Sequence, residues 1–363
     1  MKVAFITNSR APYRSLQINK FCEIKNTDFD VYYTNKNING CEWNVDKNIK
    51  FSEYSLFGMV QFIKVISLIR SYDIIILGGY DKKEYIIISI LCKLFRKKYI
   101  LLFDGINPKK IVFREDVLKF IIKKFIIMNA FSIFGNGRVS EEYFSKKFNY
   151  PKEKIFNQYL TVDIEKIMDI SKIKHKVREK LFNRYKIEKG KRIIVYSGRL
   201  VKRKNVDLLI KAISKLKAPQ NYILLIVGDG DEKKSLLQLA KSLNVNIVTT
   251  GYIKDQKELF GFYYLSDLLV LPSFNEPWGL VINEAMAAAL PVIVSDECGA
   301  SLNLVVDGFN GFIVKAGDEE KLTEAIQNVF NNREMMSKNS LKLIKNWTFN
   351  NSKNSMEIIL RQI

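Results

Sequence analysis

Short apolar runs of strand length alternate with helical patterns along the chain. Such alternation is typical of parallel sheets built from β-α-β units. The runs form two series, and each series predicts one doubly wound sheet of an α/β protein. The first series comprises residues 2–7, 29–34, 73–77, 98–103 and 131–135, and the second comprises residues 192–198, 222–228, 246–251, 268–273 and 291–295.

A charged stretch without a strand-like run separates the two series, near residues 165–190. The length of 363 residues is also typical of two domains of roughly 150 to 200 residues each. We therefore predict a first domain over residues 1–170 and a second over residues 171–344. Residues 341–363 have a helical pattern, with Trp347 as a large apolar side chain.

Positive charge dominates the composition, with a formal net charge of +20. Such a charge suits nucleic acid, an anionic membrane surface or phosphorylated ligands. We expect no nucleic-acid partner, because neither zinc-finger spacing nor an aromatic RNA-binding pattern is present. Between Lys93 and Lys124, ten Lys or Arg residues stand against three acids, interleaved with Ile, Phe and Leu. This stretch predicts either a solvated basic face or a contact with anionic lipid.

The cysteines and the N-terminus indicate where the protein works. Four cysteines are scattered without zinc-like spacing, which suits a reducing compartment. The first residues lack the long apolar core of a signal peptide. No apolar run approaches the roughly 20 residues that a membrane span requires. We therefore expect a cytoplasmic protein, peripheral at most to the inner face of a membrane.

Two glutamates, Glu276 and Glu284, are separated by seven residues in the segment NEPWGLVINEAMAAA. The pattern predicts a strand end, a turn containing Glu276, and a helix that carries Glu284 within it. Gly279 permits close approach of a ligand, and the free N–H groups at the start of the helix attract anions. The two carboxylates then lie at different depths of one crevice, where they could accept hydrogen bonds from sugar hydroxyls. The alternative is an ordinary helix with an acidic first turn.

The segment SGRLVKRKNVDLLIKA, residues 197–212, places a basic loop between a strand and a helix. Arg199 and the cluster Lys202, Arg203 and Lys204 follow Gly198. Guanidinium and ammonium groups beside a helix N-terminus can bind a diphosphate. A basic loop that is merely solvated is the alternative.

A third loop, in VGDGDEKKSLLQLA at residues 227–240, again joins a strand to a helix. Its Asp229 and Asp231 resemble a metal-binding D-x-D pair. We prefer a tight turn, in which Gly228 and Gly230 let a planar base approach the backbone. No metal site is therefore predicted.

Together these loops offer diphosphate cations, a base cradle and sugar-binding carboxylates, the parts needed for a nucleotide sugar. The chain resembles glycosyltransferase family 4, whose members are retaining enzymes with the E-x7-E motif and the GT-B fold. The resemblance is strongest over residues 190–330 and extends to members that build bacterial surface polysaccharides. It implies two Rossmann-like domains facing across a cleft, with the final helix, residues 345–363, returning to the first domain.

The resemblance also implies roles for individual residues. Arg199 and Lys204 would stabilise the leaving diphosphate, Glu276 would bind hydroxyls of the transferred sugar, and Glu284 would hold the ribose. Further donor contacts would come from Gly198, from Gly228, Asp229 and Gly230, from Tyr252 and Ile253 at the base, and from the backbone of Trp278, Gly279 and Leu280. Neither glutamate would then act as an acid or base at the reacting carbon, as the paired carboxylates of a retaining glycosidase do. No cofactor or metal would be needed, and UDP donors are favoured over GDP donors.

The acceptor side departs from the family pattern. Many members place a histidine of the first domain near the transferred sugar, but the only histidine here is His175, in the predicted linker. Asp104 stands at about that place after a predicted strand, either as a catalytic residue or as a capping Asp. The loop after the first strand offers Asn8, Arg10 and Arg14 to an acceptor, or is simply solvated.

The segment 114–130 is a basic amphipathic helix candidate. It either packs on the core or rests Lys119, Lys123 and Lys124 on anionic lipid.

The sequence thus predicts a hexosyltransferase that moves a sugar from a nucleotide sugar to a glycan acceptor, with a glycan carried on polyprenyl diphosphate as the expected acceptor, in capsule, O-antigen or exopolysaccharide synthesis. The alternatives are a GT-B sugar-nucleotide epimerase and a non-catalytic basic protein that binds membrane or nucleic acid.

Overall fold

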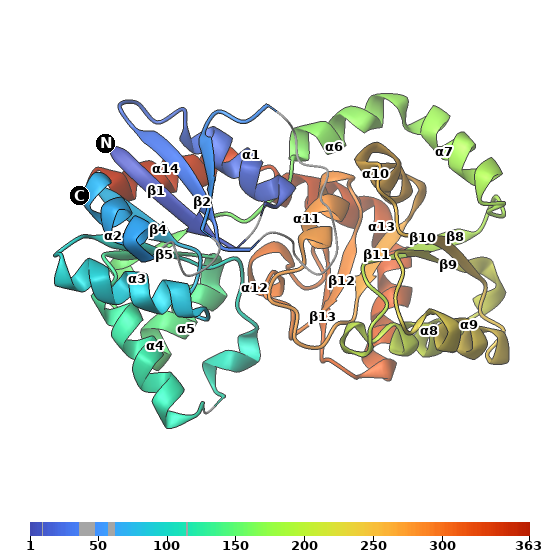
Figure 1. Cartoon of the computed structure of the whole chain (residues 1–363). Coiled ribbons are helices and arrows are strands. Elements are labelled where there is room, and N and C mark those ends of the chain that lie inside the picture. Colours follow the sequence, from blue (N-terminus) through green and yellow to red (C-terminus); the bar gives the residue numbers. More distant parts are fainter. Residues whose placement is uncertain (9, 36–47, 57–61, 114) are drawn as a thin grey trace. The chain divides into compact units, whose positions relative to one another are not determined.

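The computed structural model describes residues 1–8, 10–35, 48–56, 62–113 and 115–363. The chain forms two compact units, and helices cover both faces of the sheet in each (Figure 1). The first unit comprises Met1–Ile106, Lys110–Leu160 and Thr348–Ile363, and the second comprises Asn107–Lys109 and Thr161–Trp347. Arg114, the first residue of the predicted amphipathic helix, lies outside the described residues. No helix in the described ranges is both long and apolar enough to cross a bilayer.

The first unit contains a parallel sheet of seven strands in the order β3-β2-β1-β4-β5-β6-β7. The inner strands β4, β5 and β6 are buried throughout, because helices pack on both sides of them. The strands are β1 (Lys2–Thr7), β2 (Asp28–Tyr33), β3 (Ser52–Ser55), β4 (Ile74–Leu77), β5 (Tyr99–Leu102), β6 (Ser132–Gly135) and β7 (Ile155–Asn157). The helices are α1 (Pro12–Phe21), α2 (Phe62–Ser71), α3 (Lys83–Leu94), α4 (Val117–Asn129), α5 (Gly137–Phe148) and α14 (Phe349–Leu360), with short 3-10 turns η2 (Pro108–Ile111) and η3 (Lys152–Lys154).

The second unit contains a parallel sheet of six strands in the order β10-β9-β8-β11-β12-β13. Its strands are β8 (Arg192–Ser197), β9 (Tyr222–Val227), β10 (Ile247–Gly251), β11 (Leu268–Leu271), β12 (Val292–Ser295) and β13 (Gly311–Val314). Its helices are α6 (Ile164–Ile170), α7 (Lys174–Arg184), α8 (Val206–Ser214), α9 (Lys233–Ser242), α10 (Gln256–Leu265), α11 (Leu280–Ala287), α12 (Ser301–Leu304) and α13 (Glu319–Ile344), with 3-10 turns η4 (Ser171–Ile173), η5 (Lys202–Lys204) and η6 (Pro219–Asn221).

All ten strands expected from the sequence are present, and the described residues form three further strands at sheet edges. These are β3, β7 and β13, at the outer positions of their sheets. They are only three or four residues long, and several of their side chains are partly exposed. Edge strands of this kind lack the long apolar run by which the inner strands are recognised.

The division between the units falls after Leu160, earlier than the predicted residue 170. Helix α6 explains the difference, because it packs against α10 and α11 of the second unit. Its Ile164, Ile167 and Ile170 are buried. The charged stretch that the sequence suggested as a linker is therefore α6, η4 and α7, which belong to the second unit.

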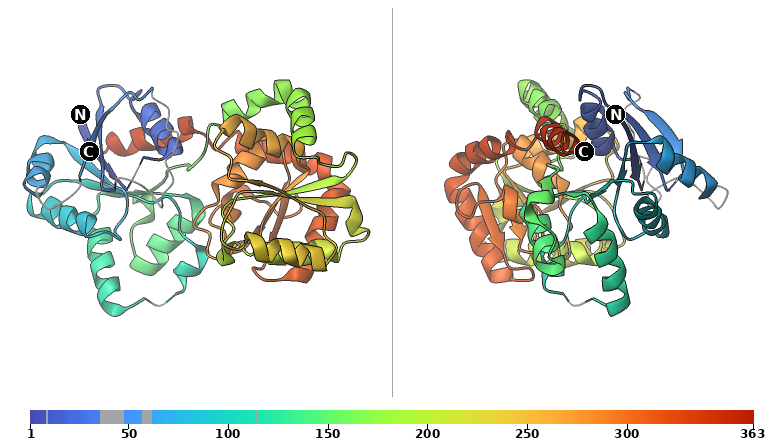
Figure 2. Two further views of the ribbon diagram at one scale, coloured as in Figure 1. Left: turned by 45° about the vertical axis from the view of Figure 1, so that its right-hand side comes forward. Right: turned by 90° about the vertical axis from the view of Figure 1, so that its left-hand side faces the viewer.

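Near its end the chain passes from the second unit, which ends at Trp347, to the first unit, which includes Thr348–Ile363. Trp347 stacks on Trp278 within the second unit, with ring centroids 5.5 Å apart. The next residue, Thr348, caps α14, which packs on α1 and β7 of the first unit and buries Met356 and Ile359. Both views in Figure 2 show α14, in red, beside the first unit's sheet.

Each sheet reverses its strand order at one point. In the first unit the reversal lies between β1 and β4, and in the second it lies between β8 and β11. In open parallel sheets, ligands bind outside the carboxyl ends of the strands at such a reversal. The loops after β8 and β11 carry the basic cluster and the two glutamates, so this rule selects the same place as the sequence motifs.

Candidate functional site

The loop after β8 and the loop after β11 are joined by hydrogen bonds and ion pairs. The Asn205 side chain donates to the Pro272 carbonyl at 3.2 Å, and the Phe274 N–H donates to the Arg203 carbonyl at 2.7 Å. Lys204 forms an ion pair with Glu276. These contacts hold Lys204, one of the two predicted diphosphate cations, beside the first glutamate of the E-x7-E motif.

Glu276 lies almost buried in the turn before α11, with 8% of its surface exposed. Lys204 Nζ donates to its carboxylate, and Arg203 Nη1 lies 3.5 Å from the same oxygen. The backbone of Glu276 is also fixed, because its N–H donates to Glu297 O and its carbonyl accepts from Gly299 N–H. The carboxylate is thus held by two cations, whereas Arg199 of the same loop is exposed.

Glu284 occupies a different environment, within α11. The Tyr263 hydroxyl of α10 donates to its carboxylate at 2.5 Å. Burial raises the pKa of Glu284 from its ordinary 4.5 to about 7, and the hydrogen bond from Tyr263 opposes that rise. Tyr263 also hydrogen-bonds Ser197, the last residue of β8, while burial beside Glu284 raises the pKa of Tyr263.

Both glutamates therefore approach the carboxyl end of β8. Glu276 does so through Lys204 of η5, and its charge also raises the pKa of Tyr196 after the larger effect of burial. Glu284 does so through Tyr263 and Ser197. One carboxylate is paired with cations and the other with a neutral hydroxyl, so they are suited to different parts of one ligand.

The raised pKa of Glu284 predicts a pH-dependent cost to stability. Above pH 7 the folded, ligand-free protein must hold this carboxylate ionised, which costs about 2–3 kcal/mol at pH 8. Below about pH 4.5 both folded and unfolded states bind the proton, and the cost disappears. Glu284→Gln should therefore raise the free energy of unfolding in urea by up to that amount at pH 8, and change it little at pH 4.5.

The exposed Glu334, within α13 and outside its first turn, provides a matched control, since Glu334→Gln should change stability little at both pH values. An equal effect of Glu284→Gln at pH 8 and pH 4.5 would contradict the assigned environment.

The glycines of the two neighbouring loops are required by close packing of backbone on backbone. A Cβ at Gly228 would lie 2.0 Å from the Gly198 carbonyl oxygen, and one at Gly230 would lie 2.4 Å from the Leu200 carbonyl oxygen. The N–H of Gly198 donates to Val227 O at 3.0 Å. Their predicted role beside a nucleotide base stays a prediction, but the loop cannot keep this path with larger residues.

Asp229 turns toward its own loop. Its carboxylate accepts from the Gly230 N–H and from Lys233 Nζ at 3.0 Å, and these contacts lower its pKa. Gly251 at the end of β10 lies next to this turn, bridged to Gly228. The following Tyr252 is 57% exposed, so its ring is free to stack on a planar ligand.

The start of α11 is built for a close backbone approach. Gly279 has φ +96°, and a Cβ there would press on Leu271 and Cys298. Trp278 is buried, with its indole N–H on Asn283 at 3.0 Å, so its side chain is not available to a ligand. Leu280 is the first residue of the helix, and its side chain is partly buried.

A buried glutamate that sequence reasoning missed, Glu297, supports this turn from behind. Its carboxylate accepts the Asn275 N–H at 3.1 Å and pairs with Lys109 at 2.5 Å. Asn107 donates to the Glu297 carbonyl, so the segment Asn107–Lys109 groups with the second unit.

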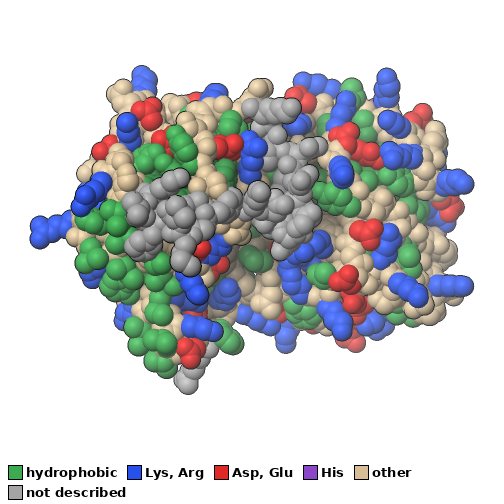
Figure 3. Space-filling model, viewed as in Figure 1, with side chains coloured by type: hydrophobic (Ala, Val, Ile, Leu, Met, Phe, Trp, Pro, Cys, Tyr) green, Lys and Arg blue, Asp and Glu red, His purple; other side chains and the backbone are tan. Residues whose placement is uncertain are grey.

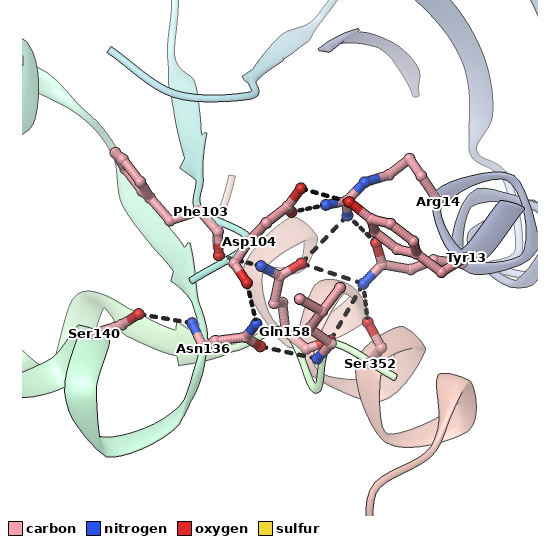
Figure 4. A network of polar contacts seen from close by, with 10 residues as sticks. Tyr13, Arg14, Phe103, Asp104, Asn136, Ser140, Gln158 and Ser352 are labelled. Atoms are coloured by element: carbon pink, nitrogen blue, oxygen red, sulfur yellow. Dashed lines mark hydrogen bonds and ion pairs between the residues drawn. The ribbon is translucent and has the colours of Figure 1, made fainter. Parts of the chain in front are cut away.

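In the first unit, Arg14 and Asp104 belong to one polar network (Figure 4). The guanidinium of Arg14, 2% exposed, donates to Asp104, to Gln17 and, at 3.2 Å, to Gln158. Gln17 in turn donates to Ser352 of α14 at 2.7 Å. Burial lowers the pKa of Arg14. Neighbouring tyrosines, Tyr13 above all, partly offset this lowering.

Asp104 itself is half exposed at the end of β5. Its carboxylate accepts from Arg14 and from the Tyr13 hydroxyl at 2.9 Å, and its carbonyl accepts from Asn136 at 2.8 Å. Arg14 is therefore placed to orient Asp104 rather than to face solvent. Asn136 and Gln158 hold the surrounding loops in position (Figure 4).

A small pocket of about 70 Å³ opens beside this network at the strand-order reversal of the first sheet. Asn8, Tyr13, Arg14, Gly78 and Asp104 are among its lining residues. The Tyr85 hydroxyl holds the Asn8 side chain at 2.5 Å. Arg10, by contrast, is exposed and pairs with Glu53 of β3 at 2.8 Å. His175 is exposed on α7 of the second unit.

The match to known families falls on the second unit. Residues 177–346 match the family described as Glycosyl transferases group 1. The match includes both loops at the β8–β11 reversal and the Glu276 and Glu284 positions.

The capsular polysaccharide biosynthesis glycosyltransferase CapM of Staphylococcus aureus is 32% identical over 161 residues, 42% of this chain and 41% of that protein. The lipopolysaccharide core biosynthesis glycosyltransferase LpsE of Rhizobium meliloti is 34% identical over 139 residues, 38% of this chain and 39% of that protein. The matched part thus spans about two fifths of these relatives.

The structure of Anabaena Alr3699/HepE in complex with UDP has a TM-score of 0.78 at 17% identity and covers 100% of both chains. The two Rossmann-like units thus have the GT-B fold of glycosyltransferase structures.

Proposed function

We propose that this protein is a nucleotide-sugar-dependent glycosyltransferase that binds its donor in the second unit. The observation that carries the proposal is the approach of the basic loop, Glu276 and Glu284 to one strand end at the reversal between β8 and β11. A nucleotide sugar presents a diphosphate, sugar hydroxyls and a ribose diol together. The site offers one kind of partner for each: cations for the diphosphate, the cation-paired carboxylate of Glu276 for the sugar hydroxyls, and the carboxylate of Glu284 for the ribose diol.

The donor would exchange with contacts that the free protein already makes. A diphosphate bound by Arg199 and Lys204 would compete with Glu276 for the Lys204 ammonium group, and would weaken the Lys204–Glu276 ion pair of the free protein. Glu276 could then accept hydrogen bonds from sugar hydroxyls, with the N–H groups of Trp278, Gly279 and Leu280 nearby. Glu284 would accept from the ribose hydroxyls in its ionised form, and Tyr252 would stack on the base. UDP is the preferred nucleotide, in line with the UDP complex of the similar HepE structure.

We further propose that transfer retains the anomeric configuration and needs no metal. The leaving phosphate would take the acceptor proton, while Arg199 and Lys204 stabilise its growing negative charge. Glu276 and Glu284 are committed to a cation cluster and to Tyr263, which supports binding roles for both.

Metal removal provides a direct prediction. Treatment with excess EDTA should leave the rate of sugar transfer within about twofold of the untreated enzyme, because fixed Arg and Lys charges replace the ion at the diphosphate. The rate is measured by product formation with and without added Mg²⁺ or Mn²⁺. A loss of transfer with EDTA that Mn²⁺ restores would contradict the metal-independent mechanism.

The acceptor is proposed to be a glycan on a lipid carrier used for bacterial surface polysaccharide. The names of CapM and LpsE, which refer to capsular polysaccharide and lipopolysaccharide core biosynthesis, support the polysaccharide part of this proposal. Asp104 would meet it from the first unit, oriented by Arg14 and Tyr13. Asn8 would line the same pocket.

The proposed activity is tested by incubating the protein with a panel of UDP- and GDP-sugars and lipid-linked glycan acceptors. Nucleotide release together with a lengthened glycan is the expected result. Conversion of the donor sugar without any acceptor would instead identify an epimerase. Failure to turn over every donor with every acceptor would remove the proposal.

A further inference from the structure

A group of large apolar side chains is exposed on the first unit, over α3, α4 and the loop before α4 (Figure 3). Monomeric proteins rarely expose many such residues together without a partner. Val112 and Leu94 are 82% and 71% exposed. We call the following six residues the apolar face: Leu94, Val112, Phe113, Leu118, Ile121 and Phe125.

The apolar face is not part of the core on α4. Leu118, Ile121 and Phe125 follow each other at helical spacing and are exposed. Ile126 and Ile127, on the other side of the helix, are buried in the core of the first unit. The helix therefore has two apolar sides, of which the sheet covers only one.

The loop that carries Val112 and Phe113 is held in place from beneath. The largely buried Lys147 of α5 donates to the carbonyls of Lys110 and Phe113, both at 2.9 Å. It also pairs with Glu115 at 2.9 Å, and Glu115 pairs with Lys123. The exposed side chains thus project from a fixed backbone. The sequence left open whether Lys119, Lys123 and Lys124 rest on lipid. Lys123 pairs with Glu115 instead, whereas Lys119 and Lys124 are exposed.

A basic pocket of about 230 Å³ adjoins the apolar face. It is lined by Lys93, Arg96, Lys97 and Lys98, and none of the described residues lining it is acidic. Lys93 connects the two features, because its amino group lies 4.7 Å from the centre of the Phe125 ring. Asn129, at the end of the same α4, also lines the pocket.

We propose that the apolar face and this pocket dock the protein on an anionic phospholipid bilayer, with a lipid phosphate in the pocket. Apolar side chains beside cations suit the boundary between headgroups and acyl chains. A second copy of the chain fits less well, because pairing this surface with itself would bring two sets of four cations together. A soluble anion would leave the apolar face uncovered.

The apolar face and the pocket share no residue with the donor loops or with the Asp104 network, and the test of this surface requires no sugar donor. The full chain is floated with vesicles of phosphatidylcholine alone and with vesicles containing about one third phosphatidylglycerol. Binding to the acidic vesicles is expected, falling about tenfold or more in Leu118→Ser/Ile121→Ser and in Lys93→Gln/Arg96→Gln. These positions are exposed, so both variants should keep the melting temperature of the wild type.

Matched controls lie on the second unit. Leu237→Ser/Met335→Ser removes exposed apolar side chains, and Lys234→Gln/Lys241→Gln removes exposed charges. Both should bind acidic vesicles like the wild type.

Three results would overturn the proposal. They are absence of binding to acidic vesicles, equal binding by the face variants and the wild type, and a dimer in sedimentation that Leu118→Ser/Ile121→Ser converts to a monomer. Release of the protein from acidic vesicles by millimolar inorganic phosphate at constant ionic strength would assign the pocket to free phosphate and count against a lipid headgroup.

Discussion

Lys204→Met is expected to lower the rate of sugar transfer by about 10²–10³-fold. Lys204 is the mostly buried cation of the basic loop and the direct partner of Glu276. Its loss removes a charge that would stabilise the leaving diphosphate and also frees the Glu276 carboxylate from its position. We expect kcat to fall more than the affinity for the nucleotide, because the charge on the leaving group grows in the transition state.

Lys202→Met is the matched control, since Lys202 lies in the same turn but is exposed. Lys202→Met should change the rate of sugar transfer by less than about threefold, because an exposed charge is screened by solvent. A folded Lys204→Met protein that transfers sugar at the rate of the control would contradict the role of the Lys204–Glu276 pair.

Arg14→Met is expected to lower the free energy of unfolding by about 3 kcal/mol, the largest stability effect that we predict for a single change. The guanidinium connects Asp104, Gln17 and Gln158 inside the first unit, and no other described group replaces it. Urea unfolding at neutral pH measures the change. Arg10→Met serves as the control, because exposed Arg10 pairs only at the surface and should cost less than about 1 kcal/mol.

Asp104→Asn separates the structural role of this network from a chemical one. Asn keeps the size of Asp104 and can still accept from Arg14 and Tyr13. If Asp104 acts on the acceptor, the variant stays folded but loses transfer.

For the preceding prediction, Arg14→Met with an unchanged free energy of unfolding would show that the network does not hold the first unit together.

The sequence predicts the inner architecture well and the edges poorly. Runs such as residues 222–228 are recognisable because they are buried on both faces, whereas β3 has the polar sequence SEYS and β7 only three residues. The sequence-based boundary at residue 170 puts helix α6 in the first domain, because its isoleucines do not reveal which sheet they cover.

The candidate sites show the same limit. Motif spacing selects Lys204, Glu276 and Glu284, since these lie in loops after recognisable strands. It cannot show that Lys204 pairs with Glu276 in the free protein, or that Arg14 reaches Asp104 across 90 positions of sequence. Tyr263 and Glu297 carry no motif, and only the packing of α10 and of the β12 loop places them beside the glutamates.

Calorimetric titration with UDP and with UDP-sugars tests most directly whether the two glutamates bind opposite ends of one donor. We predict that Glu284→Gln weakens UDP binding by at least about tenfold, because ribose hydroxyls lose a charged acceptor. Glu276→Gln should bind UDP nearly as well as the wild type but lose the added affinity of the sugar and the transfer reaction. Wild-type protein that binds no nucleotide, or equal tolerance of both replacements, would contradict this account.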